Sequence, residues 1–104
     1  MQQAIIARHD TSQTSTVTVE FAASLRRHVE CAPQSLTPGS LRAVLDGALA
    51  AAPELAHYVY DDQRSIRKHV AVFVNNQMVQ DRRNLDRLLH AGDRVLVVQA
   101  LTGG

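Results

Sequence analysis

The stretch LRAVLDGALAAAP, residues 41–53, carries the clearest structural signal in the chain. Its apolar residues recur at spacings of three and four, which places them along one face of an α-helix. They are Leu41, Val44, Leu45, Ala48, Leu49 and Ala52. Thr37 followed by Pro38 predicts an N-cap with proline at the first helical position, and Pro53 disfavours helical backbone at Ala52. The sequence therefore predicts one amphipathic helix between Pro38 and Ala52.

Strand patterns lie on both sides of this helix. Residues 16–21, TVTVEF, alternate apolar and polar side chains with the period of two that a half-buried strand requires. Residues 29–36 contain Pro33, which restricts them to an edge strand, and their position favours a hairpin-like pairing with the first strand. Residues 70–74, VAVFV, and 95–101, VLVVQAL, are apolar on both faces, which predicts strands covered on both sides.

Short connections complete the pattern. Asn75 and Asn76 tolerate left-handed backbone and predict a turn, after which Met78 and Val79 return as a short strand. Residues 53–69 predict a short helical turn followed by an exposed polar loop. Another turn precedes the last strand and carries Leu85, Leu88 and Leu89.

The order strand, strand, helix, strand, short strand, strand predicts an α+β protein. The helix supplies the crossover that lets the first and last strands lie side by side and parallel. This arrangement is a ubiquitin-like β-grasp, a mixed sheet of four to five strands wrapped around one main helix. We expect a mobile N-terminal arm over residues 1–15 and one domain over residues 16–104. Apolar residues on the outer sheet face are expected to form a docking surface. Val72 and Val97 are candidates for it, and the apolar pattern leaves open which face of the sheet each of them occupies.

Composition excludes several classes of function. Eleven basic and ten acidic residues leave a net charge of +1, and four aromatic residues are too few for base stacking, so a nucleic-acid partner is not expected. The lone Cys31 cannot close an intramolecular disulfide, which is typical of a reducing compartment. No apolar run approaches the roughly 18 residues of a membrane span. We therefore expect a cytoplasmic protein without a membrane partner.

The polar side chains predict no active site of the chain's own. The five histidines lack an i, i+4 pair and a cysteine cluster, so no metal site is expected. Asp61 and Asp62 stand beside Arg64, Arg67 and Lys68, which indicates a solvated charged loop rather than a catalytic pair of acids. Neither a phosphate-binding glycine loop nor a nucleophile–base motif is present. We expect a carrier protein or small subunit that acts with partner enzymes, not an enzyme.

The sequence ends in LTGG, residues 101–104, in which Leu101 is the last residue of the predicted strand and Thr102, Gly103 and Gly104 follow it. Because glycine has no Cβ, Gly103 and Gly104 form a tail thin enough to thread a narrow channel in another enzyme. There the carboxylate of Gly104 can attack the α-phosphate of ATP and give an acyl-adenylate. A sulfur nucleophile or an amine can then displace AMP. The terminal carboxylate is therefore the candidate functional group.

On these residues the chain resembles the MoaD/ThiS family of ubiquitin-like sulfur carrier proteins, which includes the small subunit of molybdopterin synthase. The resemblance spans about residues 16–104 and rests on VTVEFAASLR, SLRAVLDGALAAAPEL, VAVFVNNQMV, LLHAGDRVLVV and the final GG. It implies that Gly104 is adenylated and converted to a thiocarboxylate that donates sulfur in cofactor or metabolite biosynthesis, with the molybdopterin type favoured over thiazole synthesis. Gly103 would be the spacer that fits the channel, and Leu101 and Thr102 would contact the partner.

The resemblance also implies partners. A ubiquitin-activating-like adenylyltransferase would use ATP, a sulfur donor enzyme would supply sulfur and a synthase would accept it, while the chain itself would bind no cofactor. Two alternatives remain open. One is a ubiquitin-like protein modifier conjugated to a target lysine through Gly104, and the other is a non-covalent interaction subunit whose tail inserts into a partner. Substitution of Gly104 separates both covalent functions from the non-covalent one.

Overall fold

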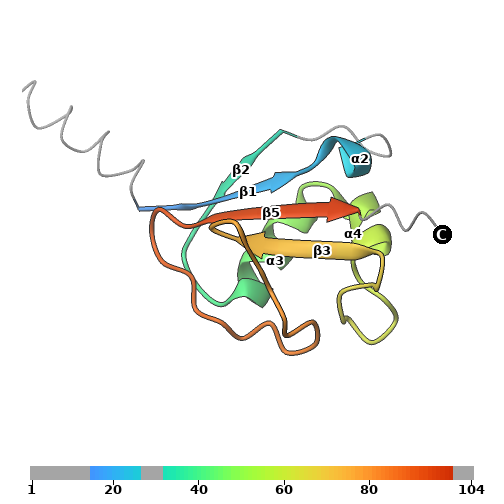
Figure 1. Cartoon of the computed structure of the whole chain (residues 1–104). Helices are drawn as coiled ribbons and strands as arrows, with labels where there is room; N and C mark the ends of the chain where they lie inside the picture. Colours follow the sequence, from blue (N-terminus) through green and yellow to red (C-terminus); the bar gives the residue numbers. More distant parts are fainter. Residues whose placement is uncertain (1–14, 27–31, 100–104) are drawn as a thin grey trace, which may run out of the picture.

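The computed structural model describes residues 15–26 and 32–99, so the predicted arm lies outside the described residues except for Ser15. Five strands and three helices follow one another in this part of the chain. They are β1 (Val17–Phe21), α2 (Ala23–Arg26), β2 (Gln34–Leu36), α3 (Leu41–Ala50), α4 (Pro53–Val59), β3 (Val70–Val74), β4 (Gln77–Met78) and β5 (Arg94–Gln99). Figure 1 shows one twisted sheet with α3 and α4 on a single face of it.

The sheet is mixed and has the strand order β2-β1-β5-β3-β4. β1 and β5 pair in parallel, with Val19 opposite Val95 and Phe21 opposite Val97. The other three pairings are antiparallel. Parallel neighbours need a long crossover, and α3 lies in the connection that provides it. The predicted α+β fold is therefore confirmed as a ubiquitin-like β-grasp.

The core lies between the sheet and the apolar face of α3. All six residues of the predicted helical stripe are buried, namely Leu41, Val44, Leu45, Ala48, Leu49 and Ala52. β1 contributes Val17, Val19 and Phe21, which expose 1% of their surface or less, and α4 contributes Leu55 and Val59. The strand period of two and the helix period of 3.6 thus point their apolar sides into one common layer.

The start of α3 differs from the prediction. The N-cap is Ser40 rather than Thr37, because the Oγ of Ser40 accepts a hydrogen bond from the backbone N–H of Ala43 at 3.1 Å. The carbonyl of Gly39 accepts a hydrogen bond from the N–H of Leu89 at 2.8 Å. This hydrogen bond ties Gly39 to a distant loop, so the helix begins only after Ser40. The local sequence does not reveal this contact.

The edge strand is shorter than predicted. Of residues 29–36, the structure places only Gln34–Leu36 in β2, antiparallel to β1, and residues 29–31 lie outside the described part. Pro33 directly precedes β2 and has no N–H to donate to a neighbouring strand, so the strand begins after it. Another proline acts as expected: α3 ends at Ala50 and Pro53 is the first residue of α4.

The predicted turns are present. Asn75 and Asn76 have φ angles of 50° and 70° and connect β3 to β4, as in a two-residue hairpin turn. Gly92, with a φ of 92°, leads into β5. Of the leucines before β5, Leu85 and Leu89 are buried, whereas Leu88 is 66% exposed.

A polar cluster joins α3 to the loop after α4. The hydroxyl of Tyr60 donates to Asp46 Oδ1 at 2.9 Å, and Arg64 Nη2 lies 2.7 Å from both carboxylate oxygens of Asp46. The guanidinium carbons of Arg42 and Arg64 each lie 5.4 Å from the centre of the Tyr60 ring, within cation–π range. Burial, followed by the hydrogen bond to Asp46, raises the pKa of Tyr60 to about 12. The cluster fixes the loop against the helix.

Tyr60→Phe tests this cluster through the pH dependence of stability. The pKa of Tyr60 lies above its unfolded value of 10.0, so its stabilisation is present below pH 10 and is lost as the pH rises through about 12. We expect the variant to be less stable than the parent by on the order of 1 kcal/mol at neutral pH, and the difference to vanish toward pH 12. Urea unfolding across this range measures it; a difference that stays constant with pH would contradict the assignment.

Gly92→Ala tests the backbone requirement before β5. An added Cβ would meet no atom within 4 Å, so the cost arises from the positive φ alone, roughly 1–2 kcal/mol. Gly39→Ala is the matched control, because its Cβ would make an ordinary contact of 3.9 Å with Ala43. We expect thermal unfolding to show a clear loss for Gly92→Ala and a change within about 0.5 kcal/mol for Gly39→Ala. Equal losses would exclude this explanation.

Candidate functional site

The residues predicted to carry the function, Leu101, Thr102, Gly103 and Gly104, lie outside the described residues, as does Cys31. The structure does describe the strand that leads to them, because β5 ends at Gln99. The candidate site is therefore built from the end of β5 and from the surfaces beside this strand.

β5 is held at both of its edges. It pairs with β1 on one side and β3 on the other, and its side chains Val95 and Val97 are buried in the core. Near the end of the strand, the N–H of Ala22 donates to the carbonyl of Val97 at 2.8 Å, and Val70 stands opposite Gln99. Gln99 is thus attached to the centre of a rigid sheet, which gives the residues that follow it a fixed base.

The start of β5 is anchored as well. Asn75 donates from Nδ2 to Asp93 Oδ1 at 3.0 Å, and its own Oδ1 accepts from the N–H of Arg94 at 3.0 Å. The N–H of His90 donates to Asp93 Oδ2 at 2.7 Å. The hydrogen bonds from Asn75 and His90 hold the pKa of Asp93 below its usual value. The turn residue Asn75 therefore connects the β3–β4 hairpin to β5.

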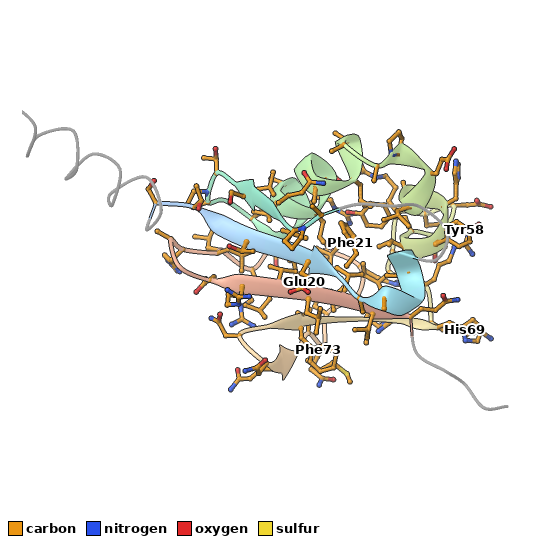
Figure 2. The ribbon with its side chains drawn as sticks, turned by 90° about the horizontal axis from the view of Figure 1, so that it is seen from above. Glu20, Phe21, Tyr58, His69 and Phe73 are labelled. Carbon is orange, nitrogen blue, oxygen red and sulfur yellow. The ribbon has the colours of Figure 1, made fainter. Side chains whose placement is uncertain are left out.

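The loop before β3 brings positive charge to the end of β5. Arg67, Lys68 and His69 are exposed and immediately precede Val70, the residue opposite Gln99. Figure 2 shows His69 at the same end of the molecule as Tyr58 of α4. The predicted exposed polar loop is confirmed, and the fold places it beside the end of the last strand. An open hollow of about 420 Å³ there is lined by Asp61, Ile66, Arg67, Lys68, His69 and Arg82.

Two side chains fix this loop. Arg82 donates from its Nη2 to the backbone carbonyls of Arg67 and Val70. Asp61 Oδ1 accepts from the N–H groups of Ser65 at 3.0 Å and Gln63 at 2.9 Å, and these bonds hold the pKa of Asp61 below its usual value. Arg82 is thus a structural arginine, a role that depends on contacts between residues distant in sequence.

The structure decides which face of the sheet Val72 and Val97 occupy, a point that the sequence left open. Val72 and Val97 are opposite each other in β3 and β5 and are buried in the core, at 2% and 0% exposure, so neither belongs to a docking surface. The alternate residues of these strands point the other way, because side-chain direction has a period of two. They form, with Met78 of β4, an apolar group that we call the outer patch: Ala71, Phe73, Met78, Leu96 and Val98.

The outer patch is apolar and remains partly open to solvent. Phe73 pairs with Leu96 on one side and with Met78 on the other, and Met78 is 49% exposed. As predicted, β3 and β5 carry apolar side chains on both faces of the sheet. Within the described residues, however, helices α3 and α4 cover only one of these faces (Figure 1). The expectation that both faces are covered is therefore wrong for the described structure.

A shallow groove runs along the polar side of this patch. It has a volume of about 300 Å³ and is lined by Thr18, Glu20, Phe73, Asn75, Asn76, Arg94, Val95 and Leu96. Figure 2 shows Glu20 of β1 and Phe73 of β3 on this side of the sheet. Phe73 and Leu96 form an apolar floor, and the charged residues Glu20 and Arg94 lie at its margin. Protein interfaces have the same arrangement, an apolar core with a polar rim.

Within residues 15–26 and 32–99, histidine, aspartate and glutamate side chains nowhere gather in the groups of three that would hold a metal ion. Asp62 is exposed, and its neighbour Asp61 accepts hydrogen bonds from the backbone of its own loop. In the described part of the chain, every helix is too short or too polar to cross a membrane.

Solved structures share this architecture. The small archaeal modifier protein SAMP1 of Haloferax volcanii matches with a TM-score of 0.71 at 18% identity, over 86% of this chain and 99% of its own. The BexX/CysO complex of Amycolatopsis orientalis contains a chain that matches with a TM-score of 0.66 at 19% identity, over 85% of this chain and 99% of its own. Urm1 of Trypanosoma brucei matches with a TM-score of 0.61 at 21% identity, over 86% of this chain and 96% of its own. At these identities the likeness shows the fold.

Sequence comparison identifies the family. No curated protein sequence matches the chain significantly. The family model of the ThiS family, however, matches residues 19–104, from the middle of β1 to the final glycine. This range includes α3, β3, β4 and β5, and it agrees with the resemblance found from the sequence motifs. The chain belongs to the ThiS family.

Proposed function

We propose that this chain is a sulfur carrier. In this function a partner enzyme adenylates the carboxyl group of Gly104, and the adenylate is converted to a thiocarboxylate that donates its sulfur to a biosynthetic acceptor. The observation that carries the proposal is the ThiS family match, which extends through β5 to Gly104. The central, well-anchored position of β5 supports it, since a tail that enters another enzyme needs a fixed base.

The proposed chemistry divides between the chain and its partners. A carboxylate oxygen of Gly104 attacks the α-phosphorus of ATP, and pyrophosphate leaves. A sulfur nucleophile from a donor enzyme then attacks the acyl carbon, a C–S bond forms and AMP leaves with the electrons of the broken C–O bond. Gly103 is proposed as the spacer that fits the enzyme's channel, with Leu101 and Thr102 in contact at its mouth. The partners supply the catalytic groups, and ATP belongs to the adenylyltransferase.

The outer patch is the proposed contact for the ubiquitin-activating-like adenylyltransferase. A partly exposed apolar surface with a charged margin is typical of a protein-binding site. Phe73 and Leu96 lie at its centre, and Leu96 belongs to β5, the strand that leads to the tail. A partner on this face is therefore close to the strand that leads to Gly104, so one docking geometry serves both recognition and reaction.

For the sulfur acceptor we propose a synthase of the molybdopterin type. The long segment of residues 53–69 supports this branch of the family, and it consists of helix α4 and the loop fixed through Arg82 and Asp61. Its size supports the molybdopterin type over the smallest thiazole-type carriers.

A second candidate function uses the same activated glycine. A lysine of a target protein, in place of sulfur, would displace AMP and form an isopeptide bond, which would make the chain a protein modifier. The Haloferax volcanii protein is named a small archaeal modifier, and this likeness motivates the candidate. The two functions differ in the nucleophile, so the product formed with sulfide and with a target protein distinguishes them.

The mass of the intact protein tests the carrier chemistry. Incubation with an adenylyltransferase of this family, ATP and a sulfide donor is expected to increase the mass by the difference between sulfur and oxygen. Gly104→Ala is expected to remain unmodified, because the added methyl group blocks the channel. An unchanged mass for the parent chain, with an enzyme active on its own carrier, would refute the proposal and favour the non-covalent subunit.

Phe73→Ala tests the outer patch. Loss of a central aromatic contact is expected to weaken binding to the adenylyltransferase by at least about tenfold, corresponding to ~1.4 kcal/mol, as measured by calorimetry. Leu88→Ala is the matched control, since Leu88 is an exposed apolar residue outside the patch. Both variants should keep the circular dichroism spectrum of the parent. Equal affinity of Phe73→Ala and the parent would place the enzyme elsewhere.

A further inference from the structure

Two side chains of opposite charge lie at the margin of the outer patch. Glu20 of β1 and Arg94 of β5 line the groove whose floor is formed by Phe73 and Leu96. Arg94 is exposed and Glu20 is half-buried. Within the described residues, neither side chain takes part in an ion pair. The open face of the sheet therefore presents one carboxylate and one guanidinium, both without a charged partner in this part of the chain, beside an apolar centre.

The strand register fixes the positions of these charges. In the parallel pairing of β1 and β5, Thr18 is opposite Arg94 and Glu20 is opposite Leu96. Glu20 and Arg94 are thus diagonal neighbours on one face of the sheet, with Cα atoms about 8 Å apart. Leu96 is in turn opposite Phe73 of β3. Both charges therefore stand directly next to the apolar pair of Leu96 and Phe73.

The same register contains a two-fold relationship. An axis in the plane of the sheet face that exchanges Glu20 and Arg94 lies midway between them, perpendicular to the line that joins them. With neighbouring strands about 4.8 Å apart and residues about 3.4 Å apart along a strand, this axis passes within roughly 2 Å of the Cα positions of Leu96 and Phe73. One symmetry operation therefore places each charge over its opposite and each of the two apolar residues over its own copy.

We infer that the outer patch binds a second copy of this chain through this two-fold axis. In the dimer, the carboxylate of Glu20 accepts hydrogen bonds from the guanidinium of Arg94 of the second copy, and the reverse pair forms at the symmetric position. Stacked sheets lie about 10 Å apart, a gap that an extended glutamate and an extended arginine span together. Phe73 and Leu96 of the two copies pack together at the axis. The strands of the two sheets cross at roughly 70°, closer to the orthogonal than to the aligned class of sheet packing.

The charges favour a second copy over an unrelated protein. An unrelated partner must supply an acid and a base at the matching diagonal spacing, whereas a second copy supplies both by symmetry. The net charge of +1 adds little repulsion between copies. The patch and its margin cover only the central part of one sheet face, so the interface is small. We expect a dimer of micromolar affinity or weaker, which exchanges readily with monomers.

The dimer has a consequence for the carrier, and this consequence rests on the proposed function. Phe73 and Leu96 are the centre of the surface proposed for the adenylyltransferase, so a second copy and the enzyme exclude each other there. The dimer is then a reserve of carrier that the enzyme does not engage. Because the interface is weak, dilution or an excess of enzyme returns the chain to the monomer.

Charge reversal in the full chain tests the pairing. Sedimentation equilibrium from micromolar to millimolar concentration should show a reversible dimer for the parent. Glu20→Arg and Arg94→Glu should each weaken self-association at least about tenfold, because like charges then face each other twice in every dimer. An equimolar mixture of these two variants should regain the association constant of the parent, since both pairs in the mixed dimer are again of opposite charge. The double variant Glu20→Arg/Arg94→Glu should regain it as well.

Two further variants control for net charge. Asp62→Arg changes the net charge as Glu20→Arg does, and Arg87→Glu changes it as Arg94→Glu does, at exposed positions outside the patch. Both should leave the association constant unchanged. Every variant should keep the circular dichroism spectrum of the parent, which shows that a loss of association does not arise from unfolding.

The outcomes separate this inference from the proposed function. A parent that stays monomeric at millimolar concentration would overturn the dimer, and so would a dimer that both charge reversals leave intact. Weakened variants whose mixture does not regain association would overturn the pairing of Glu20 with Arg94. A complex of the adenylyltransferase with the dimer would contradict the shared use of Phe73 and Leu96. Dimerisation as described, without sulfur incorporation, would refute the carrier function and leave the dimer standing.

Discussion

The parallel pairing of β1 and β5 is the constraint on which the rest of the structure depends. Two parallel neighbours require a crossover, and here the intervening chain contains α3, whose apolar face fills the space beneath the two strands. Since Val17, Val19, Val95 and Val97 all face this helix, the core and the central pairing stabilise each other. The position of the last strand at the middle of the sheet follows from the same pairing.

The fold could be predicted because its signals are periodic and local. The apolar spacing of α3, the alternation in β1 and the turn at Asn75–Asn76 each depend on neighbours in sequence, and each is present in the structure. The predictions were wrong where a contact between residues distant in sequence determines the boundary of an element. The N-cap moved from Thr37 to Ser40, next to a hydrogen bond between Gly39 and a loop about fifty residues later in the chain.

The surroundings of the candidate site were harder to predict for the same reason. An apolar strand such as β3 does not indicate which of its two faces the helices cover, so the sequence left the face of Val72 open and the structure places it in the core. Arg82 and the group formed by Asp46, Tyr60 and Arg64 acquire their roles only when the fold brings distant residues together. The function assigned to the final glycines stays a prediction, because these residues lie outside the described part of the chain.

The covered and open faces of the sheet have different consequences. Burial of α3 against one face fixes β5 at the level of its backbone, whereas the outer patch leaves the other face of the same strand partly exposed. A partner bound to the outer patch therefore contacts a surface that cannot shift relative to Gln99 without disrupting the core. The loop that carries Lys68 is attached to the same rigid frame through Arg82 and Val70. In the proposed carrier, recognition on the outer patch and activation of the tail thus share one fixed point, the end of β5 at Gln99.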